Sequence, residues 1–243
     1  GLRGFRPILF ERRAYLGGSA VLASKAPCKG LVAEYIETQK NQLAALGVQV
    51  ELNHAPTMAE LRRLDPYGIF VTMGGQQIVP DIPGIDRENV FGIEDVLLGR
   101  RVIEGRKVAV IGGGHVGLEV AHFLCANNKV TIVEMADEIG ASVYYITKFK
   151  LLPLLREAGV TFRTGQAIAA VDDGSIRLRD THTGQCTELK AEAVVLAMGS
   201  RPDLAARAAF DRNFDHVVYA GDAVRGGTML EANRDAFALA WEF

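Results

Sequence analysis

The residues best suited to chemistry form a glycine-rich turn with an acid downstream. Gly112, Gly114 and Gly117 fit G-x-G-x-x-G, and Glu134 follows about 20 residues further on, after an apolar run. The first glycine permits a tight turn, the second lets a pyrophosphate approach the backbone, and the third lets a helix pack closely on a strand. An acid at the position of Glu134 binds a ribose hydroxyl. The pattern therefore predicts a dinucleotide site.

A strand, a helix and a second strand must hold this turn in place. Residues 108–111 and 130–133 are apolar, β-branched runs typical of buried strands, and residues 118–124 carry an apolar helical face. This context makes the glycine motif specific and puts the phosphates at an amide-rich helix N-terminus. Glu119 is expected to begin the helix, either because the helix dipole favours an acid there or because it lies beside a nicotinamide.

Composition narrows the class of protein. The chain has 243 residues, 49% of them hydrophobic, with Lys+Arg 27 against Asp+Glu 29, so neither a nucleic acid nor an anionic membrane is an expected partner. No apolar run reaches the roughly 18 residues of a membrane helix, and no signal peptide is evident, which predicts a cytoplasmic protein. The three Cys form no C-x-x-C and are too few for a four-thiolate cluster, so no metal site is predicted.

Other apolar strands of the sequence also end on an acid or a glycine, as the strand before Glu134 does. Residues 7–10 are apolar and end on Glu11, and residues 217–220 lead into Gly221-Asp222. The strands before Met73-Gly74 and Met198-Gly199 also resemble each other, which indicates two related nucleotide-binding units. No strand with a glycine-rich turn precedes Glu11, so half of one unit is expected to be missing. A first residue of Gly, not Met, suggests that the natural N-terminus lies upstream.

Other segments carry weaker signals. Residues 19–29 are predicted as a loop, 31–46 as a helix, 48–52 as a strand, 89–105 as a linker and 167–179 as a hairpin. Thr57 and Glu60 have the spacing of a capping box. A closing helix from Glu231 to Trp241 is expected to dock on a sheet through its apolar residues, including Phe237. His182 has no evident partner in the sequence.

Several passages resemble a known family. Residues 10–18, 35–39, 46–48, 82–84 and 231–237 are similar to the C-terminal half of the NADH:flavin oxidoreductases related to 2,4-dienoyl-CoA reductase and trimethylamine dehydrogenase, within the pyridine nucleotide-disulfide oxidoreductase-like superfamily. The resemblance implies an α/β fold with two Rossmann-like three-layer nucleotide-binding domains. An NAD(H) domain at residues 99–203 would be inserted into an N-terminally truncated FAD domain, formed by residues 1–98 and 204–243.

The resemblance also implies roles for individual residues. On the FAD side, Glu11 would bind the adenosine ribose, Arg12 would lie near the adenine, and Gly18 and Ser19 would line the diphosphate–ribityl path. Met73 and Gly74 would form the strand turn that packs beside the nucleotide, and Asp222, after Gly221, would contact a ribityl hydroxyl or the phosphate side. Met73 departs from the family's Thr. On the NAD(H) side, the pyrophosphate would be held by Gly112, Gly114, His115, Val116 and Gly117. Glu134 would bind the ribose diol, and Met198 and Gly199 would lie near the same cofactor.

These roles lead to a functional hypothesis. Met135, Ala136 and Asp137 offer no cation to a 2′-phosphate, which favours NAD(H) over NADP(H). NADH would pass hydride to FAD, and electrons would move to an upstream barrel domain with FMN and a 4Fe-4S cluster, or to a separate acceptor. No catalytic side chain is assigned, because the cofactors carry this chemistry. The alternative is a non-catalytic NAD(H)-binding module with a broken FAD site; the substrate cannot be read.

Overall fold

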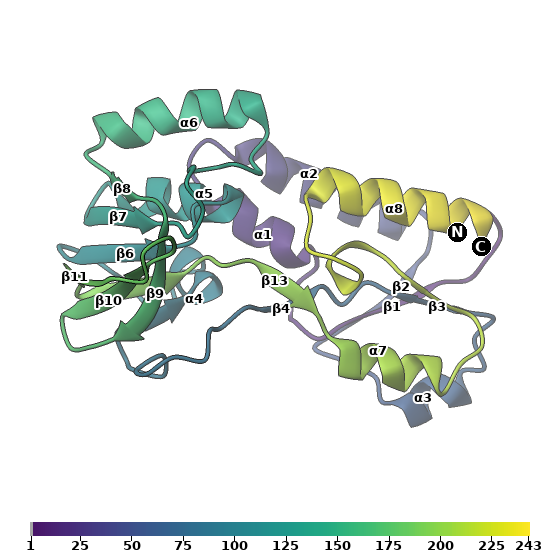
Figure 1. The fold of residues 1–243 in the computed structure, drawn as a ribbon. Coiled ribbons are helices and arrows are strands. Elements are labelled where there is room, and N and C mark those ends of the chain that lie inside the picture. Colours follow the sequence, from purple (N-terminus) through teal and green to yellow (C-terminus); the bar gives the residue numbers. More distant parts are fainter. Residues whose placement is uncertain (1) are drawn as a thin grey trace. The chain divides into compact units, whose positions relative to one another are not determined.

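The computed structural model describes residues 2–243 and divides into two compact units. Unit 1 comprises residues 2–24, Lys29–Gln76 and Ser200–Phe243, and unit 2 comprises Lys25–Cys28 and Gln77–Gly199. Figure 1 shows the elements along the chain, in the order β1 (Ile8–Glu11), α1 (Gly18–Lys25), α2 (Gly30–Ala45), β2 (Gln49–Leu52), α3 (Met58–Arg63), β3 (Ile69–Val71), β4 (Gly75–Gln77), β5 (Val90–Gly92), α4 (Ile93–Leu97), β6 (Lys107–Ile111), α5 (His115–Leu124), β7 (Lys129–Val133), α6 (Tyr145–Glu157), β8 (Thr161–Arg163), β9 (Gln166–Val171), β10 (Ser175–Asp180), β11 (Cys186–Lys190), β12 (Ala193–Leu196), β13 (Ser200–Pro202), α7 (Leu204–Asp211), β14 (Val217–Tyr219), the 3-10 turn η1 (Gly221–Ala223) and α8 (Met229–Glu242).

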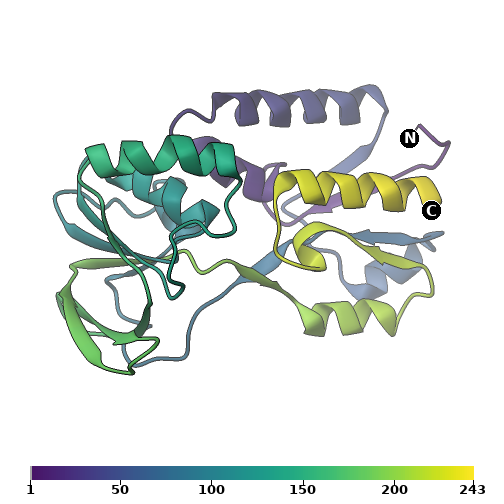
Figure 2. The same cartoon turned by 45° about the horizontal axis from the view of Figure 1, so that its top comes forward.

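Unit 2 is built on a five-stranded parallel sheet. Its order is β5-β12-β6-β7-β8, so the strand that leads into the glycine-rich turn, β6, is central. All four residues of β12 are buried, and so are residues 108–111 of β6, as expected for a parallel sheet covered on both faces. Helices α5 and α6 lie on one face of this sheet, and β9, β10 and β11 lie on the other (Figures 1 and 2).

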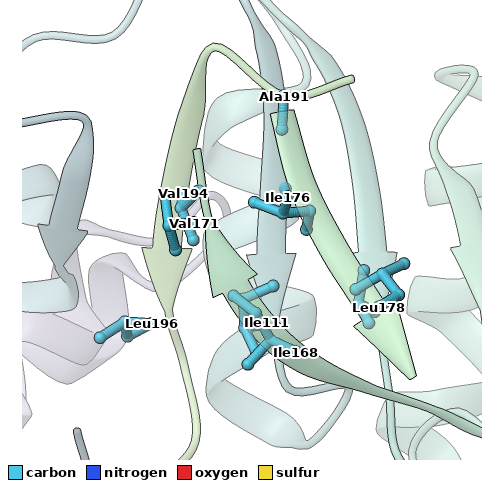
Figure 3. Packing of buried hydrophobic residues seen from close by; sticks show 10 residues of the cluster. Ile111, Ile168, Val171, Ile176, Leu178, Ala191, Val194 and Leu196 are labelled. Atoms are coloured by element: carbon cyan, nitrogen blue, oxygen red, sulfur yellow. The ribbon is translucent and has the colours of Figure 1, made fainter. Parts of the chain in front are cut away.

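An apolar layer joins the sheet of unit 2 to the antiparallel strands β9, β10 and β11. Ile111 and Val194 of the sheet face Ile168, Ile176 and Leu178 of these strands, and all five side chains are buried (Figure 3). The hairpin predicted at 167–179 is thus confirmed, and a third strand, β11, extends it. Because this layer is closely packed and continuous, it fixes the β9–β11 strands to the five-stranded sheet.

Unit 1 contains three two-stranded sheets. Strands β1 and β2 form a parallel pair, β3 and β14 form another, and β4 pairs with β13. Helices α3 and α7 contribute Leu61 and Phe210 to a small core that also holds Val71 of β3. The capping box at the start of α3 is confirmed, because Thr57 and Glu60 exchange both hydrogen bonds.

Comparison with the strand order of unit 2 shows which strand would lie between β1 and β3 of unit 1. Glu134 directly follows β7 and Gly199 follows β12, and these two strands flank the central β6. In unit 1, Glu11 ends β1 and Gly74 follows β3. Strands β1 and β3 therefore correspond to β7 and β12. Within residues 2–243, unit 1 has no strand that corresponds to β6, the central strand of unit 2.

Two segments predicted to lack regular structure are ordered elements. The loop expected at residues 19–29 is largely helical, since α1 occupies Gly18–Lys25; its small residues show almost no apolar periodicity, and none of them is buried. The expected linker at 89–105 contains β5 and α4. Strand β5 is three residues long, too short to show alternation, and it is fixed by pairing Val90 with Val194. Helix α7, with Asp203 as N-cap, was not predicted.

The closing helix α8 forms as predicted, but its packing differs. Phe237 and Trp241 are 72% and 71% exposed and stack on each other, so the prediction that Phe237 docks on a sheet is wrong. The helix has no buried residues. Helix α8 lies against the η1 turn, where Ala232 approaches Gly221, and after the helix the ring of Phe243 packs 4.7 Å from that of Phe70 on β3.

Candidate functional site

The turn between β6 and α5 has a different steric demand at each glycine. Gly112 has φ +109°, and a Cβ there would lie 2.4 Å from the carbonyl oxygen of Ala197. At Gly117 a Cβ would lie 1.8 Å from the carbonyl oxygen of Gly112, so helix and turn touch backbone to backbone. A Cβ on Gly114 would meet no neighbouring atom within 4 Å, and this residue has an ordinary φ of −74°. The protein itself therefore needs Gly112 and Gly117, while Gly114 leaves an open space.

The N-terminus of α5 faces the open space beside Gly114. This residue is the N-cap of α5, and no acidic side chain lies in the first helical turn. The amides of His115, Val116 and Gly117 open the helix, because the first intrahelical bond runs from Leu118 N–H to the Gly114 carbonyl. Free amides and the positive end of the helix dipole suit a phosphate anion. The turn thus fits the pyrophosphate of a dinucleotide.

Glu134 lies against the glycine-rich turn. The Gly113 N–H donates to Glu134 Oε2 at 2.6 Å, and the Ala136 N–H donates to Oε1 at 2.9 Å. The carboxylate is only partly buried. It is held at the end of β7, beside the turn, where it can accept from a ribose hydroxyl.

Glu119 lies in the interior of α5. The helix begins at His115, so the expectation that Glu119 begins it is wrong. Only 9% of Glu119 is exposed, and its Oε1 lies 2.8 Å from His115 Nε2. This pair spans one helical turn, which explains how a carboxylate is accommodated among Leu118 and Val120, both fully buried. His115 thus has a structural partner that its place in the motif did not indicate.

The two Met-Gly turns have similar backbones. Gly199 follows β12 with φ +85°, and Gly74 follows β3 with φ +77°, and a Cβ on either would meet no atom within 4 Å. The positive φ favours glycine at both positions. Met198 packs against the unit 2 core, whereas Met73 is 51% exposed. Each turn leaves space at the carboxyl end of its strand.

The strand end of β1 repeats the geometry found at β7. Glu11 Oε1 accepts from the Arg13 N–H at 2.8 Å, two residues on, as Glu134 Oε1 accepts from the N–H two residues on. Arg12 is exposed beside it. Gly18 and Ser19 open α1, which has no acid in its first turn. The predicted FAD residues of this segment therefore stand at a strand end and at a helix N-terminus.

Asp222 is held between two segments of unit 1. Its Oδ2 accepts from Ser200 Oγ at 3.0 Å, and its Oδ1 accepts from the Gly227 N–H at 3.2 Å. Gly221, with φ +60°, precedes it, and a Cβ there would lie 3.2 Å from Ala232 of α8. The carboxylate is oriented by neighbours on both sides, so it can present a fixed acceptor.

Two residues near Glu134 had no predicted role. His182, in the turn between β10 and β11, lies 2.6 Å through Nε2 from Oδ1 of Asp137, which is three residues after Glu134. Hydrogen bonding and charge from Asp137 raise the pKa of His182. The two residues are 45 positions apart in the sequence, so no local sequence pattern could have predicted this contact.

The parallel strands and covering helices of each unit, with the glycine-rich turn of unit 2, define a class of protein with Rossmann-like nucleotide-binding domains. A family model described as pyridine nucleotide-disulphide oxidoreductase matches residues 20–216, and the chain belongs to this family. An NADH oxidase of Thermoanaerobacter brockii is 30% identical over 246 residues, which cover 99% of this chain and 38% of that protein. The family predicted from the sequence is confirmed.

Solved structures agree with the fold. A complex of 2-naphthoyl-CoA reductase with 2-naphthoyl-CoA matches with a TM-score of 0.90 and 26% identity, over 100% of this chain and 37% of that one. Histamine dehydrogenase from Rhizobium sp. 4-9 matches with a TM-score of 0.85 over 100% of this chain and 41% of that one; at 18% identity it supports the fold alone. The predicted α/β fold with Rossmann-like FAD and NAD domains is confirmed.

The matched proteins share a common cofactor chemistry. This chain corresponds to an oxidoreductase domain of a family that binds FAD and NAD(P)H. It spans less than half the length of these relatives. Across residues 2–243, no helix has both the length and the apolar character needed to cross a membrane.

Proposed function

We propose that unit 2 binds NAD(H) and that the chain is the part of an oxidoreductase in which NADH reduces FAD. The observation that carries the proposal is the open space beside Gly114, bordered by the amides of α5 and by the anchored carboxylate of Glu134. In this proposal Gly112, Gly114, His115, Val116 and Gly117 hold the pyrophosphate, and Met198 and Gly199 border the same nucleotide.

The charge around Glu134 supports NAD(H) as the nucleotide. Glu134 is followed by Met135, Ala136 and Asp137, so a 2′-phosphate would meet two carboxylates within four residues. Lys148 of α6 approaches this loop but is paired with Glu138. A ribose diol needs only an acceptor, which Glu134 provides, whereas a phosphate needs cations.

The residues of unit 1 fit one side of an FAD molecule. In this proposal Glu11, held at the end of β1 by the Arg13 N–H, accepts from the adenosine ribose, and Arg12 lies next to the adenine side. The first turn of α1, at Gly18 and Ser19, offers amides to a diphosphate. Gly74 leaves space beside Met73, and Asp222, after Gly221, presents an acceptor held by Ser200. Bound FAD would accept a hydride from NADH and release electrons one or two at a time.

We further propose that the NAD(H) unit is an insertion between two parts of an FAD domain. Electrons would then pass to an upstream barrel domain with FMN and a 4Fe-4S cluster, or to a separate acceptor protein. The lengths of the relatives support a larger protein around such a part, because matches to two of them cover only 38% and 37% of their chains.

One observation favours the alternative of an NAD(H)-binding module without turnover. In unit 1 the described strands form three separate two-stranded sheets, β1 with β2, β3 with β14 and β4 with β13, and neither β1 nor β3 has a neighbour at the position that β6 fills in unit 2. A glycine-rich turn at that position would contact the FAD pyrophosphate in the same way as the turn after β6. Without it, this chain would hold FAD by one half of the site.

A visible spectrum separates the two functions. The chain is mixed with FAD, freed of unbound flavin, and then reduced with NADH under anaerobic conditions. The proposed reductase retains flavin absorbance, which bleaches on NADH addition. A binding module stays colourless but binds NADH in a fluorescence titration. Failure to bind either nucleotide would contradict both functions.

Removing the Glu134 carboxylate is expected to weaken NADH binding. Glu134→Ala loses a charged acceptor for the ribose diol, a loss of about 1–3 kcal/mol in binding free energy. Glu134→Gln, which keeps one oxygen toward the Gly113 N–H, should lose less. Isothermal titration calorimetry with NADH and NADPH measures this, and NADPH affinity should not fall in parallel. An unchanged NADH dissociation constant in Glu134→Ala would remove this residue from the site.

A further inference from the structure

The turn between β10 and β11 is internally fixed. Asp180 Oδ1 accepts from the backbone N–H of His182 at 3.0 Å and from that of Thr183 at 2.7 Å, and from the Thr183 hydroxyl at 2.9 Å. These bonds, the Thr183 N–H first, lower the pKa of Asp180. Such side-chain bonds to the following amides define one backbone conformation for the turn. The side chains of Thr181 and His182 are therefore presented in a set direction.

The turn contacts the loop that carries Glu134. Thr181 N–H donates to the Gly165 carbonyl at 2.8 Å, and its hydroxyl lies 3.1 Å from that carbonyl and 3.4 Å from the Met135 carbonyl. His182 Nε2 lies 2.6 Å from Asp137 Oδ1. Two adjacent residues of the turn thus contact both ends of the segment 135–137, and the closer of these contacts is the one from His182.

The same loop is bonded to the glycine-rich turn. The Ala136 carbonyl accepts from the Gly165 N–H at 2.9 Å, and the Ala136 N–H donates to Glu134 Oε1 at 2.9 Å. Glu134 Oε2 in turn accepts from the Gly113 N–H at 2.6 Å. A continuous set of hydrogen bonds therefore runs from the β10–β11 turn to the amides of the nucleotide site.

We propose that residues 180–183 clamp the loop 134–137, and that His182 is a positioning residue for nucleotide binding, acting through Asp137. The proposal rests on the proposed NAD(H) site of unit 2. Its chemistry is an ion pair between imidazolium and carboxylate that keeps Ala136 N–H on the Glu134 carboxylate and so keeps that carboxylate aimed at a ribose diol.

The strength of the His182–Asp137 contact depends on pH. The charged groups that face His182 are Asp137 from the loop and Asp180 from its own turn, and both raise its pKa, the hydrogen bond from Asp137 most. The pair is thus fully charged below the ordinary His pKa and is lost as pH rises through the elevated value. The two side chains are 65% and 74% exposed, so the pair contributes little to global stability.

The test uses ADP-ribose, which carries the pyrophosphate and the adenosine ribose but no redox group. In the unmodified chain, affinity should fall about threefold between pH 6 and 9, the scale of an exposed pair. His182→Ala and Asp137→Asn should bind at the weaker level throughout, without the pH step. The matched control is His54→Ala, because His54 pairs with Glu60 in a similar ion pair on unit 1. That variant should keep both affinity and pH step.

Amide hydrogen exchange of the ligand-free chain tests the clamp without nucleotide. Exchange at residues 135–138 should speed up in His182→Ala and stay unchanged in His54→Ala. A pH step that persists in His182→Ala belongs to another group and overturns the proposal, as does unchanged exchange in the loop. If ADP-ribose fails to bind the unmodified chain at every pH, the NAD(H) site is wrong, whatever the exchange result, and with it the role of His182.

Discussion

Replacing Gly114 with alanine is expected to weaken NADH binding about 10- to 100-fold, or about 1.4–2.8 kcal/mol, while the fold stays intact. No protein atom lies within 4 Å of the Cβ that this change adds. The added methyl group would instead occupy the space where a pyrophosphate approaches the backbone. Fluorescence or calorimetric titration with NADH measures the loss. Unchanged affinity in a folded Gly114→Ala variant would show that the phosphates do not lie at this turn.

The stability of the Gly114→Ala variant is the control for this experiment. Gly114 has φ −74° and ψ −171°, an extended conformation that alanine adopts without strain. Alanine restricts the unfolded chain but is a poorer N-cap than glycine, and these opposing effects keep the free energy of unfolding within about 1 kcal/mol of the parent. Gly30→Ala, which adds a methyl group in open space on α2, should change neither stability nor NADH affinity by more than this.

The elements around the candidate nucleotide site were predictable because their information is local. The order strand, glycine turn, helix, strand and acid lies within one continuous stretch, and the structure forms β6, α5 and β7 from it. Gly112 and Gly117 each have a steric reason, because a Cβ would meet the carbonyl oxygen of Ala197 after the adjacent strand β12 or that of Gly112 in the turn itself. The echo between Glu11 and Glu134 was also readable, because both acids end an apolar strand. Their shared hydrogen bond to the amide two residues on agrees with it.

Features set by distant contacts were not predictable. Strand β5 exists because Val90 pairs with Val194, about a hundred residues away, and its own three residues carry no alternation. The His182–Asp137 pair depends on how the β10–β11 hairpin packs on the sheet. The sequence did contain a weak signal, since Asp180 followed by Thr181, His182 and Thr183 suits a turn that an Asp side chain fixes. That signal indicates a turn but not its contact.

The exposed stack of Phe237 and Trp241 shows a different limit. Apolar spacing in α8 predicted a buried face, yet the helix has no buried residue in this chain. Spacing indicates that a helix has an apolar side, but what covers that side is decided by surrounding elements. Phe243, which follows α8, does pack on a strand, because the ring of Phe70 lies beside it.

Replacing Gly117 with alanine is expected to lower both stability and NADH binding, unlike Gly114→Ala. The new Cβ would lie 1.8 Å from the carbonyl oxygen of Gly112 and 2.9 Å from its carbon. Both are backbone atoms of the turn, so the clash cannot be relieved by a side-chain rotation. Helix α5 must move away from the end of β6, at a cost of about 3 kcal/mol, the upper range for overpacking a core. That is a large fraction of the about 5–15 kcal/mol that stabilises a domain.

The displacement of α5 also determines how binding should fail. The amides at the start of α5 and the Gly113 N–H that fixes Glu134 belong to one rigid turn, so moving the helix misaligns phosphate and ribose contacts together. Urea denaturation followed by circular dichroism should therefore show a lower midpoint in Gly117→Ala, and NADH affinity should fall at least as far as in Gly114→Ala. A Gly117→Ala chain with parental stability and weakened binding would contradict the contact between α5 and the Gly112 carbonyl. Loss of stability with parental NADH affinity would instead separate the glycine-rich turn from the nucleotide site.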